Sequence, residues 1–265
     1  MDFGIVRRAL SDGKIRIDAV DIRDFAEDKH QMTDDRPYGG GAGMVMKPEP
    51  LAGAIRSAQG KAKKIGANKI KTVLMSPQGR VFDQWMAREL AREDALIIVC
   101  GRYEGPDERI CANFIDDEIS MGDFVLSGGE PAAMLVIDAV SRLIPGVLGD
   151  SDSAVSDSFS KHLIEHGHYT RPPVFEGEKV PDVLLSGNHE DIATWRIETS
   201  LIRTFLKRPD LLSADLKPPG SSGKDGKKKT VNTVGDLLRL SEEEISILKK
   251  WTKKLESIIR AHSIK

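Results

Sequence analysis

The sequence predicts an α/β fold with a mostly parallel sheet, and three observations lead to it. Short apolar runs typical of buried strands occur at Thr72–Met75, Leu96–Cys100 and Phe124–Leu126. Segments with helical spacing, Phe82–Ala91 and Pro131–Ile144, alternate with these runs. Each run ends at a turn rich in Ser, Pro or Gly. Alternating strands and helices are typical of parallel sheets, which bind ligands at the carboxyl ends of their strands.

The first third of the chain contains weaker signals. Ile15–Val20 alternates in part and predicts a strand. Residues 34–43 form a loop, because four glycines within five positions interrupt any regular element. Pro50–Ala58 predicts a short helix, and Lys61–Lys69 predicts a polar connection.

The elements around the three apolar runs have clearer signals. The helix at Phe82–Ala91 is amphipathic, with Trp85, Met86 and Leu90 on one face. The helix that follows the third run begins with Pro131, and proline is well tolerated in a first turn, where its missing N–H has no helical partner.

The pattern changes after residue 148. A polar linker begins at Gly149, and a helix is predicted over Ile192–Leu206. The segment 217–230 is rich in Pro, Gly, Ser and Lys and is predicted to be disordered. A capping box at Ser241–Glu244 predicts a last helix with an apolar stripe that extends to Ile259.

Composition narrows the class of protein. A chain of 265 residues is more typical of two domains than of one, and 40% hydrophobic with 30% charged residues is ordinary for a globular protein. No apolar run is long enough for a membrane helix, and the first residues lack the pattern of a secretory signal. Two cysteines, Cys100 and Cys111, form no disulfide framework and favour a reducing cytosol.

Charge is distributed unevenly. The net charge is −2, but residues 217–265 carry a net +6, which leaves −8 for the rest. A basic end on an acidic body suggests a polyanionic partner near that end, but on composition alone a solvated lysine-rich tail is the better interpretation.

Several common site motifs are absent. The sequence has no G-x-G-x-x-G dinucleotide fingerprint, and no Lys-Ser/Thr follows the loop Gly39–Gly43 as in a phosphate-binding loop. His162, His166 and His168 have no neighbouring cysteine pair, so ordinary surface or hydrogen-bonding histidines are a better interpretation than a zinc site.

Eight blocks of the sequence together carry one resemblance. They are DDRPYGGGAGM (34–44), SPQGR (76–80), GRYEG (101–105), GDFVLSGGE (122–130), SRLIPGVLG (141–149), DSF (157–159), HYTRP (168–172) and LLSGNH (184–189). These blocks resemble the bacterial tRNA (guanine-N1)-methyltransferases that act at tRNA position 37, the TrmD family of the SPOUT class. They follow the family's order over roughly residues 4–212, which makes the resemblance far more specific than one motif.

The resemblance implies a SPOUT-type parallel sheet with a deep trefoil knot toward its C-terminal end, followed by a smaller, mainly helical domain. Sequence patterns alone would not predict a knot, because knots are rare exceptions to the topology rules. The implied domains are a knotted cofactor-binding domain over 1–148, a flexible linker over 149–157 and a helical tRNA-binding domain over 158–265. A cytoplasmic homodimer is also implied, with its active site at the subunit interface.

The resemblance implies S-adenosylmethionine as the cofactor, bound by three loops. Glycines there let the backbone approach a ligand closely. Each glycine alone is better explained by a turn, and only the blocks together favour ligand binding. The matching residues are Leu74, Met75, Ser76, Pro77, Gly101, Tyr103, Glu104, Met121, Gly122, Asp123, Phe124, Val125, Leu126, Gly128 and Gly129.

Two residues match the family's catalytic groups. Asp157 matches the general base that takes the proton from guanine N1, and its alternative role is a helix N-cap. Arg142 matches the residue that stabilises negative charge on guanine O6, and its alternative is a helix ion pair with Asp138.

His168, Tyr169, Arg171 and Lys207 are the implied tRNA contacts. The family is reported to use Mg²⁺, but no ligand cluster in the sequence locates a metal site. The sequence also departs from the family, because the family's first strand and helix, with a Phe-Pro-Glu motif, have no counterpart before Asp2.

Three functions follow from these observations. The leading one is transfer of a methyl group to guanine N1 in tRNA. The second is a non-catalytic RNA-binding protein that uses the basic C-terminal end. The third is a SPOUT methyltransferase with another RNA target, which would not require Asp157 as a base. Measuring methyl transfer separates the first from the second.

Overall fold

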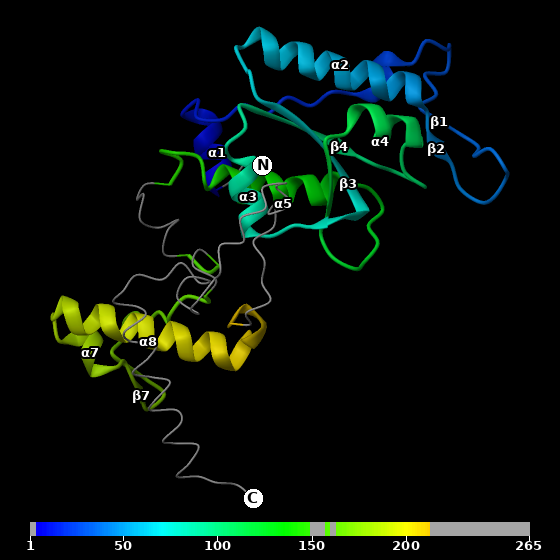
Figure 1. The fold of residues 1–265 in the computed structure, drawn as a ribbon. Helices are drawn as coiled ribbons and strands as arrows, with labels where there is room; N and C mark the ends of the chain where they lie inside the picture. Colours follow the sequence, from blue (N-terminus) through cyan, green and yellow to red (C-terminus); the bar gives the residue numbers. More distant parts are fainter. Residues whose placement is uncertain (1–3, 149–156, 160–162, 213–265) are drawn as a thin grey trace, which may run out of the picture. The chain divides into compact units, whose positions relative to one another are not determined.

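A computed structural model describes residues 4–148, 157–159 and 163–212 (Figure 1). The chain divides into two compact units, Met1–Ser151 and Asp152–Lys265, and each is described by itself. No helix within the described ranges is long and apolar enough to cross a membrane.

The first unit is built around a three-stranded parallel sheet. Its central strand β3 (Ile70–Val81) lies between β4 (Ala95–Cys100) and β5 (Asp117–Ser120). The pairing with β4 is regular, whereas the pairing with β5 shifts between Met75 and Arg80. The predicted α/β class with a parallel sheet is therefore confirmed.

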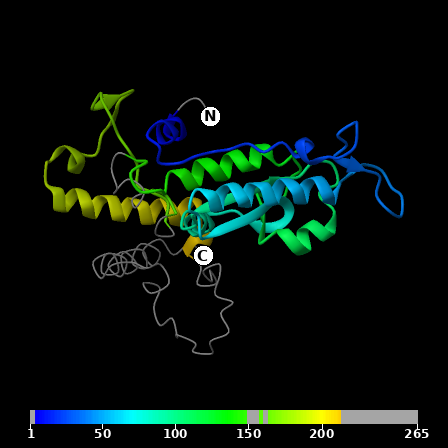
Figure 2. The ribbon, with the colours of Figure 1, turned by 90° about the horizontal axis from the view of Figure 1, so that it is seen from above.

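Helices cover both faces of this sheet (Figures 1 and 2). On one face lie α3 (Gln84–Leu90) and α5 (Glu130–Ser141), and on the other lie α2 (Pro48–Lys64) and α4 (Glu108–Phe114). Alternate residues of a strand point to opposite faces. Accordingly, Val73 and Met75 are buried with α3 and α5, and Leu74 is buried with α2 and α4.

Shorter elements complete the first unit. A helix α1 (Gly4–Ser11) and a 3-10 turn η1 (Ile22–Phe25) precede the short antiparallel pair β1 (Asp34–Asp35) and β2 (Val45–Met46). The helices α3 and α4 each begin at an aspartate whose side chain caps the first turn. The Asp83 carboxylate accepts a hydrogen bond of 2.8 Å from the Met86 N–H and so begins α3.

Two strand predictions are wrong. Ile15–Val20 is not in a strand; the Arg16 guanidinium instead pairs with Asp18 on the surface. Phe124–Leu126 is an exposed loop, and the third strand is β5, which precedes it. Asp117 and Glu118 concealed this strand, because its buried residues are only Ile119 and Ser120.

The helix bounds also differ from the prediction. The α2 helix extends through Lys64, six residues beyond Ala58, because the lysines and alanines of the predicted polar connection are good helix formers. The short helix α4 was not predicted. The strand predicted at Thr72–Met75 lies within the longer β3. This strand continues through residues 76–79, where a turn was predicted.

The described part of the second unit is mainly helical. It contains α7 (Asp182–Leu185), the long helix α8 (His189–Lys207), a hairpin of β6 (Val174–Phe175) and β7 (Glu178–Lys179), and the 3-10 turn η2 (Pro209–Leu212). The helix predicted over Ile192–Leu206 is confirmed within α8.

The segment before the hairpin is held to α8 by hydrogen bonds between the Ile164 backbone and the hydroxyls of Ser200 and Thr204. The Thr204 hydroxyl accepts from the Ile164 N–H at 2.9 Å and donates to the Ser200 carbonyl at 2.8 Å. The predictions for residues 149–156, 217–230 and 241–259 lie outside the described residues.

Candidate functional site

The carboxyl ends of the three parallel strands carry the loops that the sequence singled out. The loop after β4 and the loop after β5 meet directly, because the Gly129 N–H donates a 2.8 Å hydrogen bond to the Gly101 carbonyl. Arg102 and Gly128 form an antiparallel bridge beside it. Residues far apart in the sequence therefore line one edge of the sheet, where ligands of α/β proteins bind.

The loops after β4 and β5 approach each other closely at Gly129. A Cβ at this position would lie 2.8 Å from the Cα of Cys100, 3.0 Å from the N of Gly101 and 3.0 Å from the Cβ of Met75. These distances are well below ordinary carbon contacts of about 3.5–4.0 Å. The loop after β5 consequently lies against the ends of both β3 and β4 only because residue 129 has no side chain.

An ion pair also links the two loops. The Arg102 guanidinium donates from Nε and Nη2 to one Glu130 oxygen, at 2.9 and 2.8 Å. Burial alone would raise the pKa of Glu130, but its own backbone N–H and Arg102 lower that pKa overall. The Arg102 side chain is 59% exposed and that of Glu130 48%, so the pair positions the loops more than it stabilises the fold.

Cys100 ends β4 underneath these loops. Burial raises the pKa of its thiol to about 11, and the Glu130 carboxylate adds to the effect. The thiol is therefore protonated at neutral pH and is a poor nucleophile.

The other side of the loop after β4 contacts the glycine-rich loop. The Glu104 N–H donates to the Met44 carbonyl at 3.0 Å, and the Met46 N–H donates to the Gly105 carbonyl at 2.9 Å. The Glu104 carboxylate lies so close to Gly43 that a Cβ there would overlap it. The loop after β4 thus lies between the segment 43–46 and the segment 128–130.

Tyr103 has a left-handed backbone in this loop, with φ of 56°. Non-glycine residues rarely adopt this conformation, and it occurs often at functional sites. The Tyr103 ring is largely exposed, so burial of this side chain does not explain the conformation.

The structure brings most predicted cofactor residues to one edge of the sheet. Leu74 and Met75 are buried at the end of the regular part of β3, and Ser76 and Pro77 continue the strand. Met121 packs against the core, whereas Asp123 and the apolar side chains of residues 124–126 are exposed. The Phe124 ring lies beside Gly122.

The predicted catalytic and tRNA-binding residues are divided between the units. Arg142 follows the last turn of α5 in the first unit, and Asp157 belongs to the second. His168, Tyr169 and Arg171 lie on an exposed segment before the β6–β7 hairpin, and Lys207 ends α8.

Sequence reasoning missed the roles of Gly43, Arg102 and Glu130. All three stand inside the glycine-containing blocks, so the blocks themselves were the available signal. A single sequence does not show which residues of two blocks contact each other in the folded protein.

A separate hollow of about 720 Å³ lies between η1, α2 and α4. Its lining includes Phe25, Glu49, Arg56 and Phe114, and none of the predicted cofactor residues. The Arg56 guanidinium lies 5.0 Å from the centre of the Phe114 ring. This hollow is distinct from the loops at the strand ends.

Within the described ranges, no group of three or more His, Cys, Asp or Glu side chains is arranged to hold a metal ion.

Comparison with known proteins identifies the family. Residues 1–214 match the family model described as tRNA (Guanine-1)-methyltransferase TrmD, and these residues include every loop described above. The chain belongs to this family.

Individual relatives agree with this assignment. A tRNA (guanine-N(1)-)-methyltransferase of Desulfatibacillum aliphaticivorans is 51% identical over 98% of this chain and 89% of its own length. The proteins of the same name from Symbiobacterium thermophilum and Geotalea uraniireducens are 60% and 58% identical, over 81% and 79% of this chain and 86% and 83% of their own lengths. The first alignment, over 261 of 265 residues, includes nearly all of the segment beyond residue 214.

Proposed function

We propose that this protein transfers a methyl group from S-adenosylmethionine to N1 of the guanine at position 37 of tRNA. The observation that carries the proposal is the contact of Gly129 with Gly101 and Cys100, which joins two glycine-containing loops at the strand ends. Membership of the TrmD family supports the reaction.

The cofactor would bind at this edge of the sheet, held by the residues predicted above from β3 and the loops after β4 and β5. The close contact of the loops after β4 and β5 at Gly129 supports this location, because glycine-containing loops let a backbone approach a ligand closely. When bound, S-adenosylmethionine supplies an electrophilic methyl group.

Asp157 and Arg142 are the proposed catalytic residues. The Asp157 carboxylate accepts the proton of guanine N1, which frees the nitrogen lone pair to accept the methyl group. The Arg142 guanidinium stabilises the negative charge that develops on guanine O6. No step is assigned to Mg²⁺, since the described residues form no cluster for it.

The proposed layout has a knotted cofactor-binding domain over 1–148, a linker over 149–157 and a tRNA-binding domain over 158–265. The division of the chain into two compact units near residue 151 supports this layout. For the knot, the support is the loop after β5, which lies across the ends of β3 and β4.

A homodimer is also proposed. Its support is a set of exposed apolar side chains in the first unit, which a second copy would cover. Two of them stand on α5, and three stand in the loop after β5. They are Met134, Leu135, Phe124, Val125 and Leu126.

The tRNA substrate is proposed to contact His168, Tyr169, Arg171 and Lys207. The exposed positions of the first three support this assignment. Since tRNA is the substrate, the proposed location is the cytoplasm.

The test of the function is transfer of a labelled methyl group to tRNA transcripts with guanosine or adenosine at position 37. We expect label only with guanosine, and none with Asp157→Asn protein that still binds S-adenosylmethionine. Equal labelling of both transcripts, or full activity of the variant, would contradict the assignment.

A second experiment tests an active site shared between subunits. Arg142→Ala and Asp157→Asn proteins, each inactive alone, are allowed to exchange subunits. If one protomer supplies Arg142 and its partner supplies Asp157, the mixture regains about one quarter of wild-type activity, because half the dimers contain one intact site. No recovery despite proven exchange would place both residues of each site in the same protomer.

A further inference from the structure

A cluster of rings lies along one side of α8 in the second unit. The rings of His166 and Tyr169 each lie 6.1 Å from the Trp195 ring, and the His166 and His168 rings are 4.4 Å apart. These separations are typical of interacting aromatic rings. These four side chains, together with Arg203, are called the ring cluster below.

Arg203 places a positive charge beside the rings. It follows Trp195 by eight residues on α8, a little more than two turns, and so lies on the neighbouring part of the helix surface. A Cβ added to Gly167 would lie 3.5 Å from the Tyr169 ring and 3.7 Å from Nη1 of Arg203. Gly167 thus allows the guanidinium and the phenol ring to lie close to each other.

The Arg203 guanidinium is incompletely satisfied. Its Nε is buried and has no hydrogen-bond partner among the described residues. An unsatisfied buried donor is unfavourable. A bound anion near this guanidinium would compensate part of this cost electrostatically.

One side of the ring cluster is open to solvent. Tyr169 is 54% exposed and the His168 side chain 66%, whereas Trp195 is partly buried and its ring is tilted against that of Tyr169. A supported, rigid and exposed ring offers a flat apolar surface. A flat ring next to a guanidinium is the combination that binds nucleotides, with the base stacked on the ring and the phosphate attracted to the arginine.

We propose that the ring cluster binds one unpaired nucleotide of the RNA substrate, with the base stacked on Tyr169 and the phosphate attracted by Arg203. The inference rests on the proposed function for the identity of the RNA. It adds His166, Trp195 and Arg203 to the RNA-binding residues and gives Tyr169 a defined role.

The full-length protein and a tRNA transcript with guanosine at position 37 provide the test. Removal of the ring in Tyr169→Ala, or in Tyr169→Leu, which keeps most of the apolar volume, is expected to weaken tRNA binding by about ten-fold or more. Tyr169→Phe keeps the ring and should bind within about two-fold of wild type.

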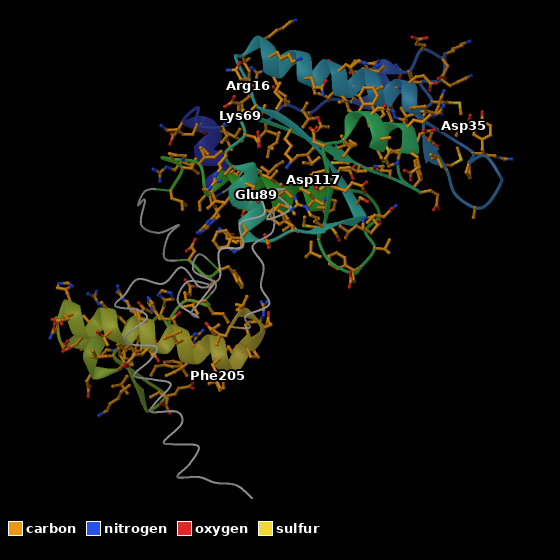
Figure 3. The ribbon with its side chains drawn as sticks, viewed as in Figure 1. Arg16, Asp35, Lys69, Glu89, Asp117 and Phe205 are labelled. Carbon is orange, nitrogen blue, oxygen red and sulfur yellow. The ribbon has the colours of Figure 1, made fainter. Side chains whose placement is uncertain are left out.

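Phe205 provides the matched control, since it stands on the same helix, is 53% exposed and lies outside the ring cluster (Figure 3). Phe205→Ala should bind tRNA as wild type does. Wild-type affinity of the folded Tyr169→Leu variant, or an equal loss in Phe205→Ala, would overturn the proposal.

A spectroscopic measurement distinguishes stacking from a structural effect. The chain has three tryptophans, so Trp85→Phe/Trp251→Phe protein reports Trp195 alone. Saturable quenching by tRNA that is lost in Tyr169→Leu supports the stacking arrangement, and no quenching at saturating tRNA refutes it.

The two hypotheses fail separately. If the wild-type enzyme methylates tRNA and the Tyr169 variants keep its KM for tRNA, the ring cluster proposal is wrong and the function stands. If tRNA binds through the ring cluster but no methyl group is transferred, the proposed function is wrong and the nucleotide site stands.

Discussion

Gly129→Ala tests whether the close approach of two loops builds the cofactor site. Gly129 has φ of −78° and ψ of −9°, a conformation that alanine adopts without strain. Any effect of the substitution must therefore come from contacts of the added methyl group. That group would lie 2.8–3.0 Å from Cys100, Gly101 and Met75, and two of these three contacts are with backbone atoms.

Either the strands or the loop must move, and the two possibilities differ in their cost. Displacing the strand ends would overpack the core and cost about 1–3 kcal/mol. Displacing the loop would break the hydrogen bond from Gly129 to Gly101, worth about 0.5–1.5 kcal/mol. Because β3 and β4 are held by a continuous ladder, we expect the loop to move. The free energy of unfolding should then fall by about 1 kcal/mol.

The effect on the cofactor should be much larger than the effect on stability. Calorimetric titration with S-adenosylmethionine is expected to show at least a ten-fold loss of affinity, about 1.4 kcal/mol, and urea unfolding supplies the stability. Gly60→Ala is the control, because it lies in α2 away from these loops and has open space around it. Wild-type cofactor affinity in a folded Gly129→Ala protein would refute the reasoning.

Three further predictions concern single residues. Gly60→Ala, inside α2 with open space around it, should raise the free energy of unfolding by about 0.5–1 kcal/mol in urea and leave methyl transfer unchanged. Glu130→Gln removes the charge that Arg102 binds, so it should raise the KM for S-adenosylmethionine several-fold and change the midpoint of thermal unfolding little. A large drop in that midpoint with an unchanged KM would contradict a positioning role. Burial would raise the pKa of Asp117, but Arg80 lowers that pKa overall from 3.8 (Figure 3). In urea titrations, Asp117→Asn should therefore lower the free energy of unfolding fully at pH 7 and by less as the pH falls below about 4. A difference in unfolding free energy between the two proteins that does not change with pH would disprove the charge effect.

The amino-acid pattern predicted those elements whose burial is continuous. Leu96–Cys100 is uniformly apolar, and β4 matches it almost residue for residue. The strand β5 was missed because Asp117 is satisfied by ion pairs with Arg80 and Lys71, which no local pattern reveals. Phe124–Leu126 was mistaken for a strand because a short apolar run does not by itself indicate a buried strand, and these three side chains are exposed.

The candidate site was predictable as a set of loops but not as a geometry. The blocks identified Gly43, Gly79 and Gly129, each of which turns out to lie against another segment. The same blocks contain Gly39, which has open space around it and a positive φ instead. The sequence does not distinguish a glycine needed for a turn from one needed for a close approach, because the difference lies in distant neighbours.

The place of Gly129 also orders the events of synthesis and folding. The loop that contains it lies on the ends of β3 and β4, so that surface does not exist until the parallel ladder has formed. The ladder joins segments distant along the chain, which makes it slow to form. The residues between β5 and Glu130 are synthesised in about a second. The loop can therefore leave the ribosome before the slow ladder is complete, and the ligand-binding edge is assembled last.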